Sequence, residues 1–346
     1  LLAGPAVKVM QVWRRWWREW SLDRGRLGLA LAALLLAIGF LQPRLPWKRS
    51  LFEHVVVIDI TQSMNVQDEL LDGKPVSRLA FAKQALHLAL QDLPCGSKLG
   101  WAIFTEYRSY LLFAPVEVCA NRAELRASLA AIDGRMAWSG NSEVAKGLHS
   151  SIVVAKALPG TPSLVFVTDG HESPPLNARH RPAFDDKPGE VAGVIVGVGQ
   201  ARPSPIPKLD PLGRPLGFWG ADEVAQVDPR SQGRGASVGQ ELMVDEGGVA
   251  EAAGLGATPG SEHLSGLREP YLRLLAQENG FAFHKLRSAA ALSKALRDQA
   301  LSRPVRVSGD ARVLLAALAF GLLLVPYLTA LWAARRSRRL AAAAGG

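Results

Sequence analysis

The sequence predicts an α/β protein in which a doubly wound, mostly parallel sheet is flanked by helices, with one transmembrane helix on each side of this domain. Between residues 54 and 301, short apolar runs rich in β-branched residues alternate with helical patterns, which is typical of such a sheet. Two uncharged apolar segments, 27–43 and 313–334, bracket this region. Both are close to the length of about 20 residues that a bilayer requires.

The positive charge of the chain lies at its two ends. The formal net charge is +9, but residues 1–26 carry six basic and two acidic side chains, and residues 335–346 carry four arginines. Only about one positive charge is left for the sequence between these tails. A nucleic-acid-binding protein would concentrate basic side chains on a folded surface, so we expect no nucleic-acid partner.

The basic tails also predict the orientation in the membrane. Basic residues are retained on the cytoplasmic side, so both termini are expected there and the domain across the membrane. The four tryptophans of segment 1–26 suit a headgroup region. The segment 27–43 could instead be the apolar core of a signal peptide, but the residues 42–46 that follow (QPRLP) are not a small-residue cleavage site. We therefore predict a bacterial inner-membrane protein with two spans and a periplasmic domain.

Strands and helices alternate along the domain. A buried strand over 54–60 (HVVVIDI) precedes a helix that Ser77 caps and that runs to about Leu93. The remaining predicted elements are strands at 98–105 and 109–114, helices at 121–132 and 142–157, strands at 163–168 and 191–198, a helix at 269–279 ended by Gly280, a strand at 281–286 and a helix at 289–301.

One long stretch lacks this alternation. Residues 200–266 are rich in Gly and Pro and show little periodicity, so we interpret them as an insertion into the domain. Within it, residues 216–219 could form a short hairpin strand, and residues 233–260 are expected to be mobile.

Oxygen-bearing side chains follow the predicted strands. Asp59, Thr61 and Ser63 come at the end of strand 54–60, Asp169 follows strand 163–168, and Ser142 opens a helix. Carboxylates and hydroxyls without thiolates or paired histidines are hard ligands, which favour Mg²⁺, Ca²⁺ or Mn²⁺ and not zinc. In a doubly wound sheet, ligands bind beyond the carboxyl ends of the strands, so these side chains are expected to meet there.

This set resembles the metal-ion-dependent adhesion site of the von Willebrand factor A (VWA) domain family. The family pattern is Asp-x-Ser-x-Ser, then a distant Thr and a distant Asp, and the matching positions are Asp59, Thr61, Ser63, Ser142 and Asp169. Thr61 and Ser142 depart from the pattern but keep a hydroxyl. The resemblance covers residues 54–301 apart from the insertion. It implies that a bound divalent ion takes the acidic side chain of a partner protein, with Met64 and Trp138 on the rim.

Catalytic interpretations find less support. Asp59 lacks the second carboxylate two residues on that would suit a phosphoryl-transfer aspartate. The run 235–239 (GASVG) matches a nucleophile elbow in letters, but no apolar strand precedes it. His171 and Glu172 have no visible partner in the sequence and are interpreted as loop or rim residues. We therefore expect a binding protein and not an enzyme.

Two spans around one such domain resemble bacterial membrane-anchored VWA proteins that work beside a cytoplasmic MoxR-type ATPase and other VWA membrane proteins. Within that group, the chain is similar to methanol-oxidation accessory proteins of the MxaL type. This implies a role in maturing periplasmic methanol dehydrogenase, including its calcium insertion. The alternative is a general envelope stress-tolerance (Bat-like) protein. The stretches that carry the similarity are 59–66, 75–83, 104–109, 115–121, 136–148, 165–174, 206–222 and 262–271.

The chain contains two cysteines, Cys95 and Cys119. Cys95 precedes strand 98–105 and Cys119 follows strand 109–114. If these strands form an antiparallel hairpin, both cysteines lie at the same end of it, within reach of a disulfide bond. A periplasmic location would permit that bond. The alternative is a pair of small buried thiols.

Overall fold

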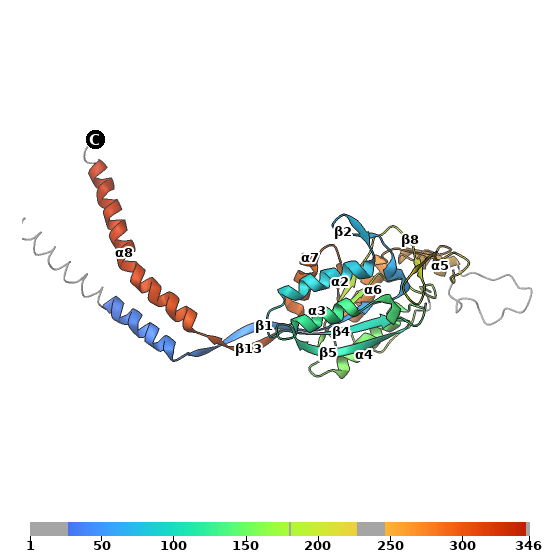
Figure 1. Cartoon of the computed structure of the whole chain (residues 1–346), viewed down its shortest axis with the longest axis horizontal. Helices are drawn as coiled ribbons and strands as arrows, with labels where there is room; N and C mark the ends of the chain where they lie inside the picture. Colours follow the sequence, from blue (N-terminus) through green and yellow to red (C-terminus); the bar gives the residue numbers. More distant parts are fainter. Residues whose placement is uncertain (1–26, 180, 227–245, 344–346) are drawn as a thin grey trace, which may run out of the picture. The chain divides into compact units, whose positions relative to one another are not determined.

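The central sheet has the strand order β12-β7-β6-β1-β4-β5. Figure 1 labels β1, β4 and β5, which are neighbours in this order. Neighbouring strands run parallel except for β5, which is antiparallel to β4. The prediction of a doubly wound, mostly parallel sheet is confirmed. The strands are β1 (Arg44–Asp59), β4 (Lys98–Thr105), β5 (Arg108–Glu117), β6 (Ser163–Thr168), β7 (Gly193–Gly197) and β12 (Ala282–Lys285).

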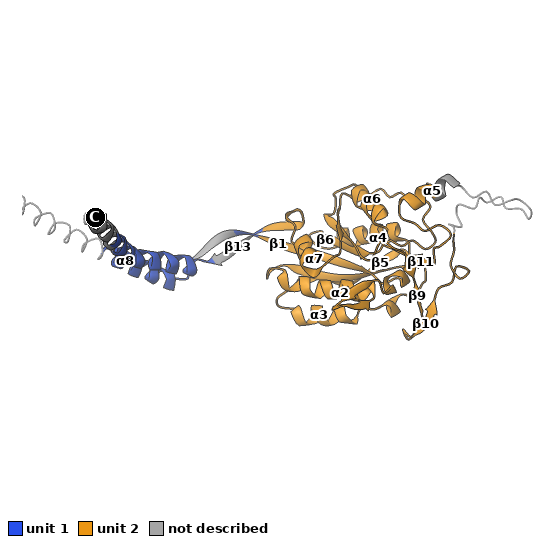
Figure 2. Ribbon diagram, turned by 90° about the horizontal axis from the view of Figure 1, so that it is seen from above, with its two compact units in different colours: residues 1–49, 305–346 blue, residues 50–304 orange. Residues whose placement is uncertain are grey.

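This structure is a computed structural model that describes residues 27–179, 181–226 and 246–343. Contacts divide the chain into two units, residues 50–304 and residues 1–49 with 305–346 (Figure 2). The larger unit contains the sheet and its helices, and the smaller unit contains the apolar helices.

The strand order creates a crevice between β1 and β6. From β1 the chain proceeds outward through β4 and β5, and it then returns to the other side of β1 and proceeds through β6, β7 and β12. The loops that leave the carboxyl ends of β1 and β6 therefore diverge, and ligands of doubly wound sheets bind at this switch point. Asp59 ends β1 and Asp169 follows β6.

Helices cover both faces of the sheet (Figure 2). Alternate side chains of β1 enter different cores, because successive residues of a strand point to opposite faces. Val56 and Ile58 pack in one core, and Val55 and Val57 pack in the other. The first core includes residues of α2 (Arg78–Ala89), α3 (Arg122–Ala131) and α7 (Ala289–Leu296), and the second includes residues of α4 (Val144–Ala157) and α6 (Glu269–Asn279).

Most predicted boundaries agree with the structure within a few residues. The Ser77 side chain accepts a hydrogen bond from the Ala80 N–H at 3.1 Å and so caps α2, and Gly280 ends α6 with a positive φ of 69°. The first strand begins ten residues earlier than predicted, at Arg44. Two predicted helices are shorter, because α2 and α7 are followed by 3₁₀ turns at Leu90–Asp92 and Gln299–Leu301.

Residues 200–266 contain more regular structure than expected. β8 (Ser204–Pro205) pairs with β11 (Leu264–Ser265), and β9 (Pro207–Leu209) pairs with β10 (Pro215–Phe218), so the expected hairpin strand is present. Of the stretch 233–260 that we expected to be mobile, residues 233–245 lie outside the described part of the chain. The remainder includes the helix α5 (Glu246–Gly254), which the expectation did not foresee.

A short hairpin also precedes α2. It consists of β2 (Glu69–Leu71) and β3 (Lys74–Val76), which Asp72 and Gly73 connect with positive φ angles of 51° and 75°. We did not predict this hairpin, although Asp-Gly between short strands favours such a turn.

The smaller unit contains two apolar helices. α8 (Arg312–Ala343) includes the window Arg312–Thr329, which is long and apolar enough to cross a bilayer by length and composition. The other helix, Leu27–Phe40, is shorter than that test requires. In the described residues one of the two predicted spans is thus supported, whereas the basic segment 1–26 lies outside them. β13 (Ser302–Asp310), which precedes α8, pairs with β1.

Candidate metal-binding site

Asp59 is fully buried at the end of β1, and its hydrogen-bond donors are all neutral. Its Oδ1 accepts hydrogen bonds from the Thr61 N–H at 2.8 Å and the Thr61 hydroxyl at 2.7 Å, and its Oδ2 accepts one from the Thr168 hydroxyl at 2.6 Å. No cation forms an ion pair with Asp59 among the described residues. Burial, and then the negative charge of Asp169, raise the pKa of Asp59 to about 7.

Asp169, also fully buried, accepts four hydrogen bonds. Its Oδ1 accepts from the Ser63 hydroxyl at 3.1 Å and the His171 N–H at 2.9 Å. Its Oδ2 accepts from Arg78 at 2.5 Å and the Ser265 hydroxyl at 3.2 Å. Two carboxylate oxygens offer about four lone-pair sites, so these donors use the whole capacity of Asp169.

Arg78 supplies the buried positive charge next to Asp169. Its guanidinium also donates to Asp68 at 2.6 Å and to the Ser265 carbonyl at 2.8 Å. Gly199 passes so close that a Cβ there would lie 2.6 Å from the Arg78 Nε. The sequence patterns predicted no role for Arg78. A cation in the first turn of a helix opposes the helix dipole, and this was the available signal that Arg78 needs an anionic partner.

Ser142 joins the site from the loop before α4. Its hydroxyl donates to the His171 carbonyl at 2.8 Å, and its backbone exchanges hydrogen bonds with Ser173. Thr61, Ser63 and Ser142 all line one cavity of about 430 Å³. The structure thus brings the five residues of the predicted metal site to one place: two buried carboxylates and three hydroxyls that line a cavity.

The donor chemistry of these residues fits a divalent ion. Each hydroxyl gives its proton to an oxygen acceptor, namely a carboxylate for Thr61 and Ser63 and a backbone carbonyl for Ser142. A hydroxyl oxygen that donates its proton keeps two lone pairs, so all three oxygens can still coordinate a cation. Asp59 uses three of its four lone-pair sites and has one left for the same purpose.

The two residues expected on the rim differ in exposure. Met64 is 0% exposed and belongs to the hydrophobic core, so the prediction that it contacts a partner is wrong. It lies in a 3₁₀ turn, Gln62–Asn65, which directs it inward. Trp138 is 56% exposed, contacts Tyr110 edge-on at 4.9 Å between ring centres, and donates from Nε1 to Glu106 at 3.1 Å.

His171 and Glu172 lie in the loop after β6 as expected, but they are buried and paired, so the interpretation as rim residues without partners is wrong. The His171 ring nitrogen Nδ1 lies 3.1 Å from Arg268, and Glu172 accepts a hydrogen bond from the Tyr271 hydroxyl at 2.5 Å. Burial lowers the pKa of His171, and burial raises the pKa of Glu172 to about 7. Both side chains line the cavity. Their partners lie almost 100 residues away in the sequence.

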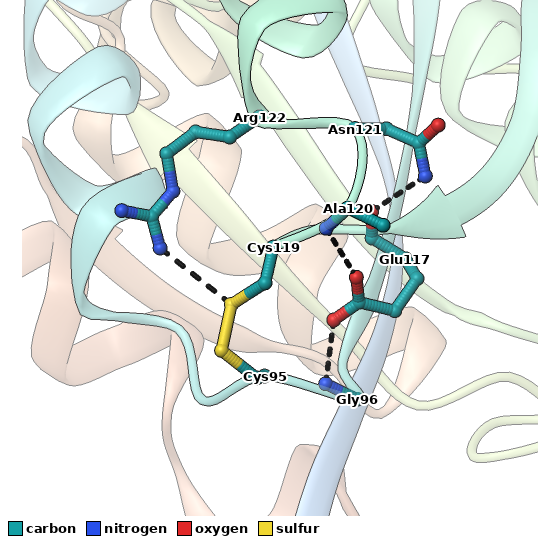
Figure 3. The surroundings of a disulfide bond; sticks show 7 residues. All are labelled: Cys95, Gly96, Glu117, Cys119, Ala120, Asn121 and Arg122. Atoms are coloured by element: carbon teal, nitrogen blue, oxygen red, sulfur yellow. Dashed lines mark hydrogen bonds between the residues drawn. A yellow bond between two sulfur atoms is a disulfide. The ribbon is translucent and has the colours of Figure 1, made fainter.

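The predicted disulfide is present. Cys95 and Cys119 are bonded, with 5.3 Å between their Cα atoms (Figure 3). Glu117 braces the same corner by accepting hydrogen bonds from the Gly96 N–H at 2.6 Å and the Ala120 N–H at 2.5 Å. These two cysteines and Glu117 lie close enough to hold a metal ion. Because the sulfurs are bonded to each other, we interpret the group as a structural brace.

No protein-family model matches the chain, and no curated protein sequence matches it. The solved structures that are similar to it include VWA-type domains and Bat aerotolerance membrane proteins. An aerotolerance-related membrane protein from Bacteroides fragilis is 16% identical, with 72% of this chain and 98% of that chain covered and a TM-score of 0.44. BatB from Bacteroides thetaiotaomicron is 14% identical, with 71% and 95% covered and a TM-score of 0.43.

A von Willebrand factor type A structure from Catenulispora acidiphila is also similar. The two chains are 13% identical over 78% of this chain and 43% of that chain, with a TM-score of 0.39. All three TM-scores lie below 0.5, so these similarities carry no argument here. The fold of this chain is instead described by its own strand order and two cores.

Proposed function

We propose that Asp59, Thr61, Ser63, Ser142 and Asp169 hold a divalent metal ion, and that the ion binds an acidic side chain of a partner protein. The observation that carries this proposal is the environment of Asp59. A fully buried carboxylate whose hydrogen-bond donors are all neutral is costly unless a cation compensates its charge. A divalent ion next to the three cavity-lining hydroxyls would supply that compensation.

The five residues would have different roles in binding the ion. Asp59 provides the charged ligand atom, and Thr61, Ser63 and Ser142 provide neutral oxygens. Asp169 is already fully hydrogen-bonded, so it acts through the Ser63 hydroxyl, whose proton it accepts. Such a site carries little protein charge, and the bound ion keeps a coordination position for an external carboxylate. Mg²⁺, Ca²⁺ and Mn²⁺ all accept such oxygen ligands.

We propose a binding function and not a catalytic one. The titratable side chains His171 and Glu172 line the cavity, but each is held by a buried partner, Arg268 or Tyr271. These pairs stabilise the loop that follows β6 and favour a fixed recognition surface.

For the cellular role, we propose a membrane-anchored protein whose domain lies in the periplasm, with both termini in the cytoplasm. The disulfide supports an oxidising compartment. On the resemblance of stretches such as 59–66 and 206–222 to methanol-oxidation accessory proteins of the MxaL type, we propose methanol dehydrogenase as the client, with calcium insertion as the step assisted. Deleting the gene and measuring calcium in purified methanol dehydrogenase tests this role. Unchanged calcium would favour the stress-tolerance role beside a MoxR-type ATPase.

Calorimetry on the purified full chain in detergent micelles tests the metal site. We expect Mg²⁺ or Ca²⁺ binding that Asp59→Ala abolishes, whereas Asp185→Ala, which removes an exposed carboxylate outside the cavity lining, leaves the affinity unchanged. Equal metal affinity in both variants would contradict the assignment.

A further inference from the structure

One wall of the cavity carries the hydroxyls of Thr61, Ser63 and Ser142, and a second wall comes from residues 206–225 and from Glu262. In contrast to the hydroxyl wall, the second wall is largely apolar. Its residues are Ile206, Trp219, Glu223, Val224, Ala225 and Glu262. The cavity volume of about 430 Å³ lies in the range of roughly 300–1,000 Å³ that is typical of small-ligand pockets. The site is therefore large enough to enclose a ligand group and part of what is attached to it.

Several interactions hold this wall in place. The Trp219 backbone N–H donates to the Ile206 carbonyl at 3.1 Å, and the Lys208 ammonium lies 4.6 Å from the centre of the Trp219 ring. Lys208 also pairs with Glu223, whose other oxygen accepts a hydrogen bond from the Gly220 N–H at 3.0 Å. Because backbone and side-chain bonds both fix Trp219, its ring forms a stable boundary of the cavity.

Trp219 carries a polar group without a partner. Its indole Nε1 is buried and donates to no acceptor in the described residues. Because the Nε1 atom is closed off from solvent, a ligand in the cavity would contact the apolar part of the Trp219 ring and not this N–H.

The charges of the wall determine which ligand is acceptable. Glu172, Glu223 and Glu262 line the cavity, and each has its own donor: Tyr271, Lys208 and Arg268 respectively. Among the described residues, no lysine or arginine belongs to the lining. A carboxylate ligand is therefore stable in this cavity only next to a bound cation, and the apolar side chains favour an uncharged group beside it.

We propose that the cavity recognises a carboxylate together with an adjacent apolar side chain, with the carboxylate at the hydroxyl wall and the apolar group against Ile206 and Trp219. This proposal rests on the proposed metal site and adds the partner's sequence preference to it. An internal Asp before Leu and a chain-terminal Leu carboxylate both present this chemistry.

Peptide titrations on the full chain in micelles with saturating Mg²⁺ test the proposal. The probes are acetyl-Gly-Asp-Leu-Gly-amide, the matched acetyl-Gly-Asp-Gly-Gly-amide, and acetyl-Gly-Gly-Leu with a free carboxylate, followed by ligand-observed NMR. We expect the Asp-Leu peptide to bind roughly tenfold more tightly than the Asp-Gly peptide, because it buries a leucine side chain. The third probe shows whether a chain terminus serves equally well.

Variants of Trp219 test whether this residue causes the preference for the Asp-Leu peptide over the Asp-Gly peptide. Trp219→Ala should remove the tenfold difference between the two Asp peptides. Trp219→Phe should keep most of the difference, since it retains an apolar ring. Phe218→Ala is the control, because Phe218 is an exposed neighbour on β10 that does not line the cavity. Near-ultraviolet circular dichroism shows whether each variant is folded.

Two outcomes would overturn the proposal: equal or absent binding of the two Asp peptides to the unmodified chain, or a leucine preference that survives Trp219→Ala. Failure of the metal site has a different signature. If the leucine preference persists in EDTA and in Asp59→Ala but disappears in Trp219→Ala, then the apolar wall recognises the ligand and the metal assignment is wrong.

Discussion

The disulfide between Cys95 and Cys119 should contribute a measurable part of the stability of the domain. The two cysteines are 24 residues apart in the sequence, and they join the entry to β4 with the exit from β5. In the chain-entropy model, a loop of this length stabilises the folded state by about 3.5 kcal/mol at 25 °C. The double substitution Cys95→Ser/Cys119→Ser should therefore lower the free energy of unfolding by about that amount.

Urea unfolding of the full chain in micelles, followed by tryptophan fluorescence, measures this loss. Trp101 on β4 is fully buried and reports on the hairpin that the bond closes. Dithiothreitol should destabilise the unmodified protein by a similar amount and leave the double variant unaffected, which makes the variant its own control. A loss below about 1 kcal/mol, or a reductant effect that remains in the variant, would refute the reasoning.

The same variant should bind metal normally. The disulfide precedes the amino end of β4, which pairs in parallel with β1, whereas Asp59 lies at the carboxyl end of β1. The eight residues of β4 separate these two ends by about 26 Å at ~3.3 Å per residue. A fall in Mg²⁺ affinity in the folded variant would show that this separation does not isolate the two features.

Three further predictions concern pH, packing and topology. Burial lowers the pKa of His54 to about 4, below its unfolded value of 6.5. The stability that neutral His54 contributes is therefore complete above pH 6.5 and decreases by up to about 3 kcal/mol as the pH falls toward 4. Urea unfolding of His54→Gln should lack this pH dependence. Gly147→Ala places a Cβ 2.1 Å from the Phe104 ring and should lower the free energy of unfolding by about 1–3 kcal/mol. This loss should exceed that of Val153→Ala on the exposed side of the same helix, and an equal or smaller loss would contradict the close packing of Gly147 against Phe104. A reporter active only in the periplasm should be active when fused after residue 260 and inactive after Arg339, and the reverse pattern would contradict the predicted orientation.

Local sequence patterns were sufficient to predict most of the central sheet, because the apolar pattern of each strand or helix agrees with the structure that it adopts. β4, β6 and α6 have the bounds that their apolar patterns and flanking residues predicted, and Ser77 and Gly280 act as the caps that their types suggest. Residues 200–266 were harder to interpret, because their strands are two to four residues long and because β8 pairs with the distant strand β11.

The part of the candidate site that follows the strands could be predicted from local patterns, whereas the contacts from distant residues could not. Asp59 and Asp169 follow recognisable strands, and the parallel order of those strands brings them together. Arg78 and Ser265 reach Asp169 from 91 and 96 residues away, and no periodicity in the sequence encodes such contacts. Met64 was misplaced because a 3₁₀ turn reverses the chain directly after β1 and buries a side chain that a simple loop would expose.

The central claim, a divalent ion at the carboxyl ends of β1 and β6, is tested most directly by diffraction from crystals of the protein grown with Mn²⁺. An anomalous difference map should contain a peak in the cavity, within coordination distance of an Asp59 carboxylate oxygen and of the Thr61, Ser63 or Ser142 hydroxyls, and the peak should vanish in Asp59→Ala crystals. Well-ordered side chains at these positions with no peak between them, or a peak held by other residues, would contradict the account.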